Sequence, residues 1–209
     1  MSSRIILVRH GESEGNAAGV LQGRLDFALS ELGRRQAGLT AERLATSGAY
    51  QVISSPLLRA SATAALVAER LGLTLRLDPD LAEYDIGDAS GLSPAELRDR
   101  FPEVIQARAA GQRLRFPGEE GRDTFQRRLE LILARMAGAE GTTIAVAHGG
   151  VISAMCHMVV GLDVNRPGAF QVGNCSLTEL RPDRAGSLVI HRHNDTCHLA
   201  EIATFADRG

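Results

Sequence analysis

The chain has 209 residues, of which 44% are hydrophobic and 23% are charged, and its mean hydropathy is close to zero. This is enough apolar material for one substantial core, so we expect a single domain over residues 1–209. A net charge of -2 and a pI near 6.3 exclude an overall field that would hold nucleic acid or a membrane surface, so any anion site must be local.

The first half of the chain alternates apolar, strand-like runs with amphipathic helical patterns. Strands are expected at residues 4–8, 51–54 and 73–77. Helices are expected at residues 30–48 and 56–71. Ser30 is a suitable N-cap for the first helix, Pro56 suits the first turn of the second, and Gly72 is a suitable stop for it. Residues 78–80 read Asp-Pro-Asp, which predicts a turn.

Residues 81–122 have a different character, because they are rich in glycine and proline. Within them, residues 93–96 read SPAE, a capping box with Pro94 at the first helical position, which predicts a short helix. The rest is predicted to form loops and short helices. We expect this segment to be an excursion over one face of the sheet.

Regular elements return after this excursion. An amphipathic helix is expected from Asp123, with five apolar residues on one face: Phe125, Leu129, Ile132, Leu133 and Met136. A buried strand is expected at 142–147, a helix at 149–161 and a hairpin of strands at 176–181 and 187–192. This order predicts an α/β fold, a three-layer α/β/α sandwich with a mostly parallel mixed sheet.

The cysteines and the N-terminus favour a cytoplasmic location. Three cysteines, an odd number, in a chain too large to need disulfides suggest reduced thiols, and we expect Cys156, Cys175 and Cys197 to be ordinary core residues. The N-terminal apolar run is too short for a secretory signal, and no segment approaches a membrane span.

Four polar stretches follow predicted strands. They read RHG (9–11), SSPLLRA (54–60), LAEYDIG (81–87) and AHGG (147–150). Because the carboxyl ends of parallel strands converge on one crevice, where ligands bind, we expect these stretches to meet.

The residue types in these stretches point to a phosphate site. Arg9 and Arg59 supply fork-shaped donors that match phosphate oxygens. Gly149 and Gly150 allow backbone N–H groups at a helix N-terminus to face an anion.

The histidines and one carboxyl group add chemistry to that site. His10 is a candidate nucleophile, because neighbouring arginines depress the pKa of an imidazole and keep its electron pair free. Arg9, Arg59 and His148 would stabilise the charge that spreads over a transferring phosphoryl group. Glu83 is the candidate general acid, since a carboxyl group beside a phosphate tends to keep its proton.

Taken in order, RHGESEGN, SSPLLRA, LAEYDIG and VAHGG resemble the histidine phosphatase superfamily, in its phosphoglycerate mutase-like branch. The resemblance covers essentially the whole chain and includes LQGRLDFALSELGRRQA at residues 21–37. It implies a metal-independent phosphomonoesterase of histidine acid phosphatase type, with no cofactor, that works through a phosphohistidine. Residues 81–122 would then cover the active site.

The resemblance also assigns residue roles. It implies that His10 is phosphorylated, that Arg9, Arg59 and His148 form the phosphate pocket, and that Glu83 donates the proton. The expected substrate-binding positions are Asn16, Gln22, Gly23, Gly149 and His198.

The sequence departs from the family pattern in the covering segment. Many of the phosphatases read G-x-W-E-G where this chain reads GDASG (87–91), and PGGES where it reads PGEEG (117–121). Phosphoserine, phosphoglycerates, phosphosugars and nucleotide-pathway phosphates therefore all stay open as the small phosphorylated metabolite. Arg108 is expected to be a solvated residue, whereas Arg113 and Arg115 are equally suited to solvent and to a substrate carboxylate.

Three other functions compete with hydrolysis. A mutase would pass the phosphoryl group to another hydroxyl, and a silent module would only bind phosphate. A metal site built from His10, His148 and Glu83 is disfavoured, because it would place a dication beside two arginines. The C-terminal hairpin offers an edge at which two copies could form a homodimer.

Overall fold

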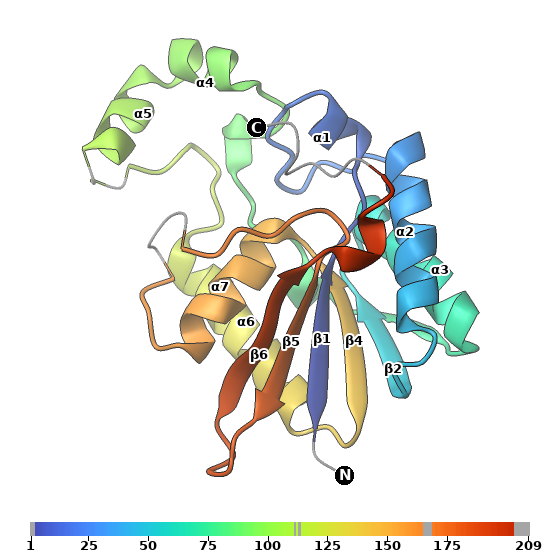
Figure 1. Cartoon of the computed structure of the whole chain (residues 1–209). Coiled ribbons are helices and arrows are strands. Elements are labelled where there is room, and N and C mark those ends of the chain that lie inside the picture. Colours follow the sequence, from blue (N-terminus) through green and yellow to red (C-terminus); the bar gives the residue numbers. More distant parts are fainter. Residues whose placement is uncertain (1–2, 111, 113, 165–168, 203–209) are drawn as a thin grey trace.

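The computed structural model describes residues 3–110, 112, 114–164 and 169–202. Within these residues a six-stranded sheet has the order β3-β2-β4-β1-β5-β6 (Figure 1). The strands are β1 (Arg4–Arg9), β2 (Ala49–Ser54), β3 (Leu75–Leu77), β4 (Thr142–Ala147), β5 (Leu177–Pro182) and β6 (Leu188–Asp195). β5 runs antiparallel to both of its neighbours, β1 and β6, and the other pairs are parallel.

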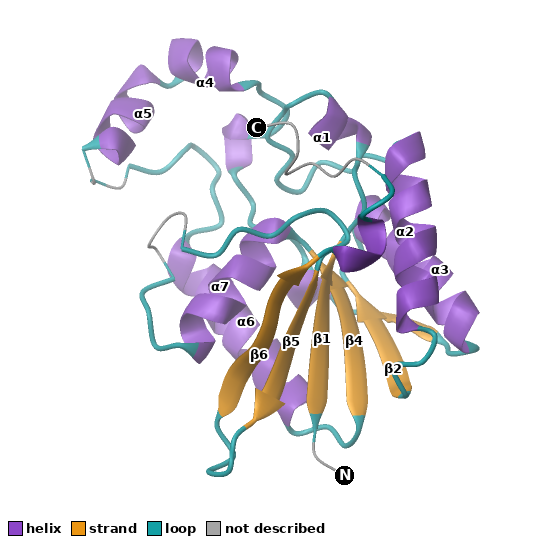
Figure 2. Ribbon diagram, viewed as in Figure 1, coloured by secondary structure: helices purple, strands orange, loops and turns teal. Residues whose placement is uncertain are grey.

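Helices cover both faces of this sheet (Figure 2). The α-helices are α1 (Glu14–Ala17), α2 (Glu31–Leu44), α3 (Leu58–Leu71), α4 (Pro94–Arg100), α5 (Pro102–Ala109), α6 (Arg122–Ala137) and α7 (Gly149–Val159). Short 3₁₀ turns lie at Pro79–Leu81, Gly87–Ala89 and Cys197–Leu199. One hydrophobic cluster joins the sheet to α2 and α3, and another joins it to α6 and α7. The predicted three-layer α/β/α sandwich with a mostly parallel mixed sheet is confirmed.

β1 shows why its sequence is apolar without alternation. Ile5 and Leu7 pack in the cluster with α6 and α7, whereas Ile6 and Val8 pack in the cluster with α2 and α3. All four side chains are buried, because the strand lies inside the sheet with helices on both faces. The residues that follow β1 therefore lie at the end of a rigid, central strand.

Several element boundaries differ from the predictions. α3 begins at Leu58, after an extended Leu57, so Pro56 lies outside the helix. The backbone N–H of Leu58, in the first turn, donates to the carboxylate of Asp26. This is a tertiary contact, so the sequence around Leu58 does not predict it. α2 ends at Leu44, and residues 78–80 contribute to a 3₁₀ turn rather than an isolated turn.

The segment 81–122 lies beyond the carboxyl ends of the central strands. Figure 1 shows α4 and α5 above this edge of the sheet, on the same side as α1. The capping box predicted at SPAE is present at the start of α4, and α5 follows almost at once. Ala89, Leu97, Val104 and Phe116 form a small hydrophobic cluster that belongs to this segment alone.

Two further expectations concern the surface. None of the helices in the described part of the chain combines the length and the apolar character that a membrane span needs. Cys156 and Cys175 are buried core residues, as expected, but Cys197 is exposed because it begins a short 3₁₀ turn after the edge strand β6.

Candidate active site

A cavity of about 360 Å³ opens at the carboxyl ends of β1 and β4. Eight predicted site residues line it: Arg9, His10, Asn16, Gln22, Gly23, Arg59, Glu83 and Gly149. They come from four stretches that are far apart in the sequence. The structure therefore brings the predicted stretches together, as the parallel-strand argument requires.

His10 directly follows β1 and is buried at this cavity. Its Nδ1 lies 2.7 Å from the Gly11 carbonyl oxygen, which can only accept, so Nδ1 carries the proton and Nε2 keeps its electron pair. Burial lowers the pKa of His10 well below its ordinary value, and the charges of Arg9 and Arg59 lower it further. The ring is thus a neutral imidazole with one basic nitrogen, as a nucleophile must be.

His148 follows β4, and its ring packs edge-to-face against the ring of His10. The centroids of the two rings are 5.1 Å apart, and His148 Nε2 is 2.8 Å from Ser55 Oγ. Burial lowers the pKa of His148 well below its ordinary value, and the charges of His10, Arg59 and Arg9 add to this. His148 is not among the residues that line the cavity, so a direct contact with phosphate stays a prediction.

The two arginines supply the positive charge of the cavity. Arg9 ends β1 and donates to the Val172 carbonyl, and Arg59, 1% exposed, lies in the first turn of α3. Arg59 donates to the carbonyls of Leu25 at 2.7 Å and Gly23 at 2.8 Å, and its Nε has no hydrogen-bond partner among the described residues. Burial lowers the pKa of both guanidinium groups, and the carboxylate of Glu83 opposes that effect. Two cations against one carboxylate leave a net positive charge, which suits an anion.

Glu83 is held by backbone N–H groups. Its Oε1 accepts from Tyr84 N at 2.9 Å, and its Oε2 accepts from Gly150 N at 3.1 Å. A Cβ on Gly150 would lie 2.5 Å from Oε1, so glycine is needed there for this close approach. The N–H of Gly150, which was expected to face a bound anion, donates to Glu83 instead, and both Gly149 and Gly150 line the cavity. Asp85 and Asp88, the nearby carboxyl groups, do not line it.

Asn16 and Gln22 are fixed by a serine that precedes α1. Ser13 forms a capping box with Asn16, whose Oδ1 accepts from the Ser13 N–H at 3.2 Å. Ser13 Oγ also lies 2.7 Å from Gln22 Oε1. Because Asn16 Oδ1 accepts from Ser13 and from Asn174 Nδ2, the NH₂ group of Asn16 is the one left to donate to a ligand in the cavity.

Sequence reasoning missed part of the cavity wall. Val20, Leu21, Tyr84 and Ile86 also line it. Gly150, which was expected at the anion site, lines it as well. Tyr84 belongs to one of the polar stretches, so its position beside Glu83 was the available signal. Val20, Leu21 and Ile86 lie in loops without hydrophobic periodicity, so the sequence contained no signal for their positions.

One predicted substrate position, His198, lies elsewhere. His198 Nε2 is 3.1 Å from Thr40 Oγ1 on α2, and His198 is not among the cavity-lining residues. Arg108 lies over the Phe116 ring and pairs with Glu119 at 3.1 Å, so it is not simply solvated. Arg115 packs beside Gly121, and Arg113 lies outside the described residues.

The alternative is a metal site built from His10, His148 and Glu83. Within the described ranges, no group of three or more His, Cys, Asp and Glu side chains is placed to hold a metal ion. His10 and His148 instead face the positive charge of Arg9 and Arg59.

Two buried neutral histidines should make the stability depend on pH. His10 and His148 have pKa values below the ordinary 6.5 in the folded chain, so the unfolded chain binds more protons as the pH falls below that value. We expect the free energy of unfolding to drop by up to about 1.4 kcal/mol per pH unit for each histidine between pH ~6.5 and ~5.5. Urea unfolding at both pH values measures this, and His10→Asn should reduce the slope. The remainder comes from His148 and from His193 and His198, whose pKa values burial also lowers. Equal slopes in both proteins would contradict it.

Comparisons with known proteins find a family and several relatives that this chain resembles. A sequence model of the histidine phosphatase superfamily (branch 1) matches residues 5–196. The chain is 35% identical over 187 residues to glucosyl-3-phosphoglycerate phosphatase of Mycolicibacterium vanbaalenii, which covers 85% of this chain and 83% of that protein. It is 34% identical over 209 residues to probable phosphoglycerate mutase GpmB of Yersinia pestis, which covers 94% of each. The solved structure of a mycobacterial glucosyl-3-phosphoglycerate phosphatase with VO3 matches with a TM-score of 0.82 at 31% identity, covering 93% of this chain and 100% of that one.

Proposed function

The chain belongs to the histidine phosphatase superfamily (branch 1), and from this membership we propose that it hydrolyses a small phosphorylated metabolite through a phosphohistidine at His10. One observation carries the proposal: the neutral His10 ring lies at a cavity with Arg9 and Arg59. The enzyme would be a phosphoric monoester hydrolase of histidine acid phosphatase type that needs no metal or other cofactor.

In the first step, the electron pair of His10 Nε2 forms a bond to phosphorus while the bond between phosphorus and the ester oxygen breaks. The bound substrate phosphate places a negative charge beside Glu83, which favours its protonated form. Glu83 gives this proton to the ester oxygen, which leaves as an alcohol. Arg9 and Arg59 meet the charge on the equatorial oxygens, which is electrostatic stabilisation of the transition state. The products of this step are phosphohistidine, the alcohol and a carboxylate at Glu83.

In the second step, water attacks the phosphorus and the P–N bond breaks. Glu83, now a carboxylate, takes the proton of the water, and inorganic phosphate and neutral His10 are formed. Glu83 thus serves first as the acid and then as the base. It can do both because it lines the cavity in which the ester and later the water would lie.

The substrate side of the cavity is partly apolar. Val20, Leu21 and Ile86 line it together with Gln22. The mycobacterial relative is named for glucosyl-3-phosphoglycerate, and we include that compound in a panel with 3-phosphoglycerate, phosphoserine, sugar phosphates and nucleoside monophosphates. The compound with the highest kcat/KM identifies the leaving group that this wall accepts.

Phosphoryl transfer to a second hydroxyl is the alternative, and the similarity to the probable phosphoglycerate mutase of Yersinia pestis favours it. Both reactions share the phosphohistidine and differ in the acceptor. Incubation with 3-phosphoglycerate separates them, because a phosphatase releases inorganic phosphate whereas a mutase yields 2-phosphoglycerate.

The decisive experiment traps the intermediate. The protein is mixed with radiolabelled phosphomonoester in EDTA, quenched, and tested for protein-bound phosphate that is labile in acid and stable in base. We expect such phosphate on His10 and EDTA-insensitive turnover of p-nitrophenyl phosphate. Absence of both would favour a silent phosphate-binding module, and loss of turnover in EDTA would favour metal catalysis.

The setting of the reaction is also proposed. We expect the protein to act in the cytoplasm on a small metabolite rather than on nucleic acid or at a membrane. The edge strand β6 is the candidate surface for a homodimer. A monomeric mass by light scattering would contradict the dimer.

A further inference from the structure

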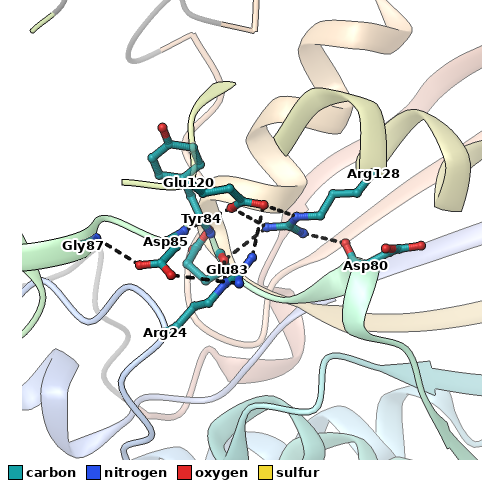
Figure 3. Close-up of polar contacts among 8 residues, drawn as sticks. All are labelled: Arg24, Asp80, Glu83, Tyr84, Asp85, Gly87, Glu120 and Arg128. Carbon is teal, nitrogen blue, oxygen red and sulfur yellow. Dashed lines mark hydrogen bonds and ion pairs between the residues drawn. The ribbon is translucent and has the colours of Figure 1, made fainter. Parts of the chain in front are cut away.

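Two arginines hold the main chain of the proposed proton donor (Figure 3). Glu83 lies between the 3₁₀ turns Pro79–Leu81 and Gly87–Ala89, in a segment without a strand or helix. Its backbone carbonyl accepts hydrogen bonds from Arg24 Nε at 3.3 Å and from Arg128 Nη2 at 3.2 Å. The main chain of Glu83 therefore lies outside the strands and helices, and these two side chains hold it.

Arg128 connects this segment to the sheet. It stands on α6, whose apolar face packs in the hydrophobic cluster that includes β1 and β4. Besides the Glu83 carbonyl, Arg128 donates to the Asp80 carbonyl at 2.6 Å, so it holds the segment at two points. α6 is thus a fixed support for the loop that carries the carboxyl group.

Glu120 joins the two arginines. Its Oε1 is 2.8 Å from Arg128 Nε and 3.1 Å from Arg24 Nη2, and its Oε2 is 3.1 Å from Arg128 Nη2. Oε2 also accepts from the backbone N–H of Asp85 at 3.2 Å. The carboxylate of Glu120 thereby links the loop after α1, the Glu83 segment and α6, as Figure 3 shows for the side chains.

Burial makes this arrangement sensitive to the loss of one member. The Glu120 side chain is only 7% exposed. Burial alone would raise the pKa of Glu120, but the hydrogen bonds and charge of Arg128, with the charge of Arg24, outweigh it and lower the pKa overall. A buried guanidinium that loses its carboxylate is strongly disfavoured and tends to move toward water. Arg24, Glu120 and Arg128 should therefore hold their positions as a unit.

The unit does not belong to the cavity wall. Arg24, Glu120 and Arg128 are absent from the residues that line it, whereas Glu83 is present. Arg24 and Arg128 reach the cavity wall through their hydrogen bonds to the Glu83 carbonyl. Building on the proposed function, we propose that Glu120 is a positioning residue, which holds Arg24 and Arg128 so that they keep the Glu83 carboxyl group directed at the leaving-group oxygen.

The proposal makes a prediction that depends on the leaving group. Phenyl phosphate and p-nitrophenyl phosphate differ by one nitro group, but nitrophenolate is a stable anion and needs little proton donation. In Glu120→Gln we expect kcat/KM for phenyl phosphate to fall about 10- to 100-fold, since a shift of about 1 Å can cost that much. For p-nitrophenyl phosphate the loss should be under about threefold. Steady-state assays at one pH measure both.

Matched variants separate positioning from stability. Arg128→Gln should show the same preference for the better leaving group. Arg135→Gln is the control, because Arg135 stands about two turns further along α6 and binds Asp78 and Asp80 of the same segment without touching Glu83. It should lose activity on neither substrate. Arg24→Gln, on a side chain that is 42% exposed, removes one support with little risk to folding and should show a weaker form of the effect.

Equal losses on both substrates in Glu120→Gln and Arg24→Gln, or no loss on either, would overturn the positioning role. A wild-type protein that hydrolyses neither ester and forms no phosphohistidine would instead refute the proposed function itself. Thermal unfolding of each variant shows which losses come from the fold.

Discussion

Replacing His10 with alanine should lower kcat for p-nitrophenyl phosphate by on the order of 10⁴-fold or more, because the variant has no nucleophile. Among the described residues that line the cavity, His10 is the one histidine. His148 does not line the cavity, and its Nε2 is 2.8 Å from Ser55 Oγ. The rate of nitrophenol release and the amount of trapped phosphoprotein should both fall to background.

His191→Ala is the matched control, because it removes an exposed histidine on β6, away from the cavity. It should keep wild-type activity. A His10→Ala protein that still forms acid-labile phosphoprotein would show that another residue is the nucleophile.

Replacing Glu83 with glutamine should have the second largest effect, and the effect should depend on the leaving group. We expect kcat/KM for phenyl phosphate to fall by about 10²- to 10³-fold, because the departing oxygen no longer receives a proton. The loss with p-nitrophenyl phosphate should be much smaller. KM should not rise, because the change removes a negative charge that acts on Arg9 and Arg59.

Asp88→Asn gives the control for this prediction. Asp88 is a nearby carboxyl group, but it is exposed and does not line the cavity. It should leave both rates unchanged. If Asp88→Asn lost activity with phenyl phosphate and Glu83→Gln did not, the proton donor would be Asp88.

The ends of strands made much of the site predictable. Arg9 and His10 stand at the end of β1 and His148 directly follows β4, and both strands are apolar runs that a sheet covered on both faces must bury. Parallel pairing of β1 with β4 brings their ends to one edge. The apolar runs therefore fixed where the strands end, and parallel pairing placed the residues that follow them at the same edge of the sheet.

Most helices were predictable for a similar reason. The five apolar residues of the predicted face of α6 are all buried: Phe125, Leu129, Ile132, Leu133 and Met136. Ser30 caps α2 and Gly72 ends α3 with a φ of 65°, as their residue types suggest. Such signals act within one or two turns, so they are present in the sequence itself.

Only the tertiary structure decided how Glu83 is held. The close approach of its carboxylate to Gly150, and the grip of Arg24 and Arg128 on its carbonyl, join residues from separate loops and helices. His198, expected at the substrate, lies against Thr40 on α2 instead. Contacts of this kind depend on how distant segments pack, and they leave no periodicity or cap in the sequence. Composition and pattern therefore determined the sheet, its helices and the place of His10, the proposed nucleophile. Long-range packing determined how Glu83, the proposed proton donor, is held.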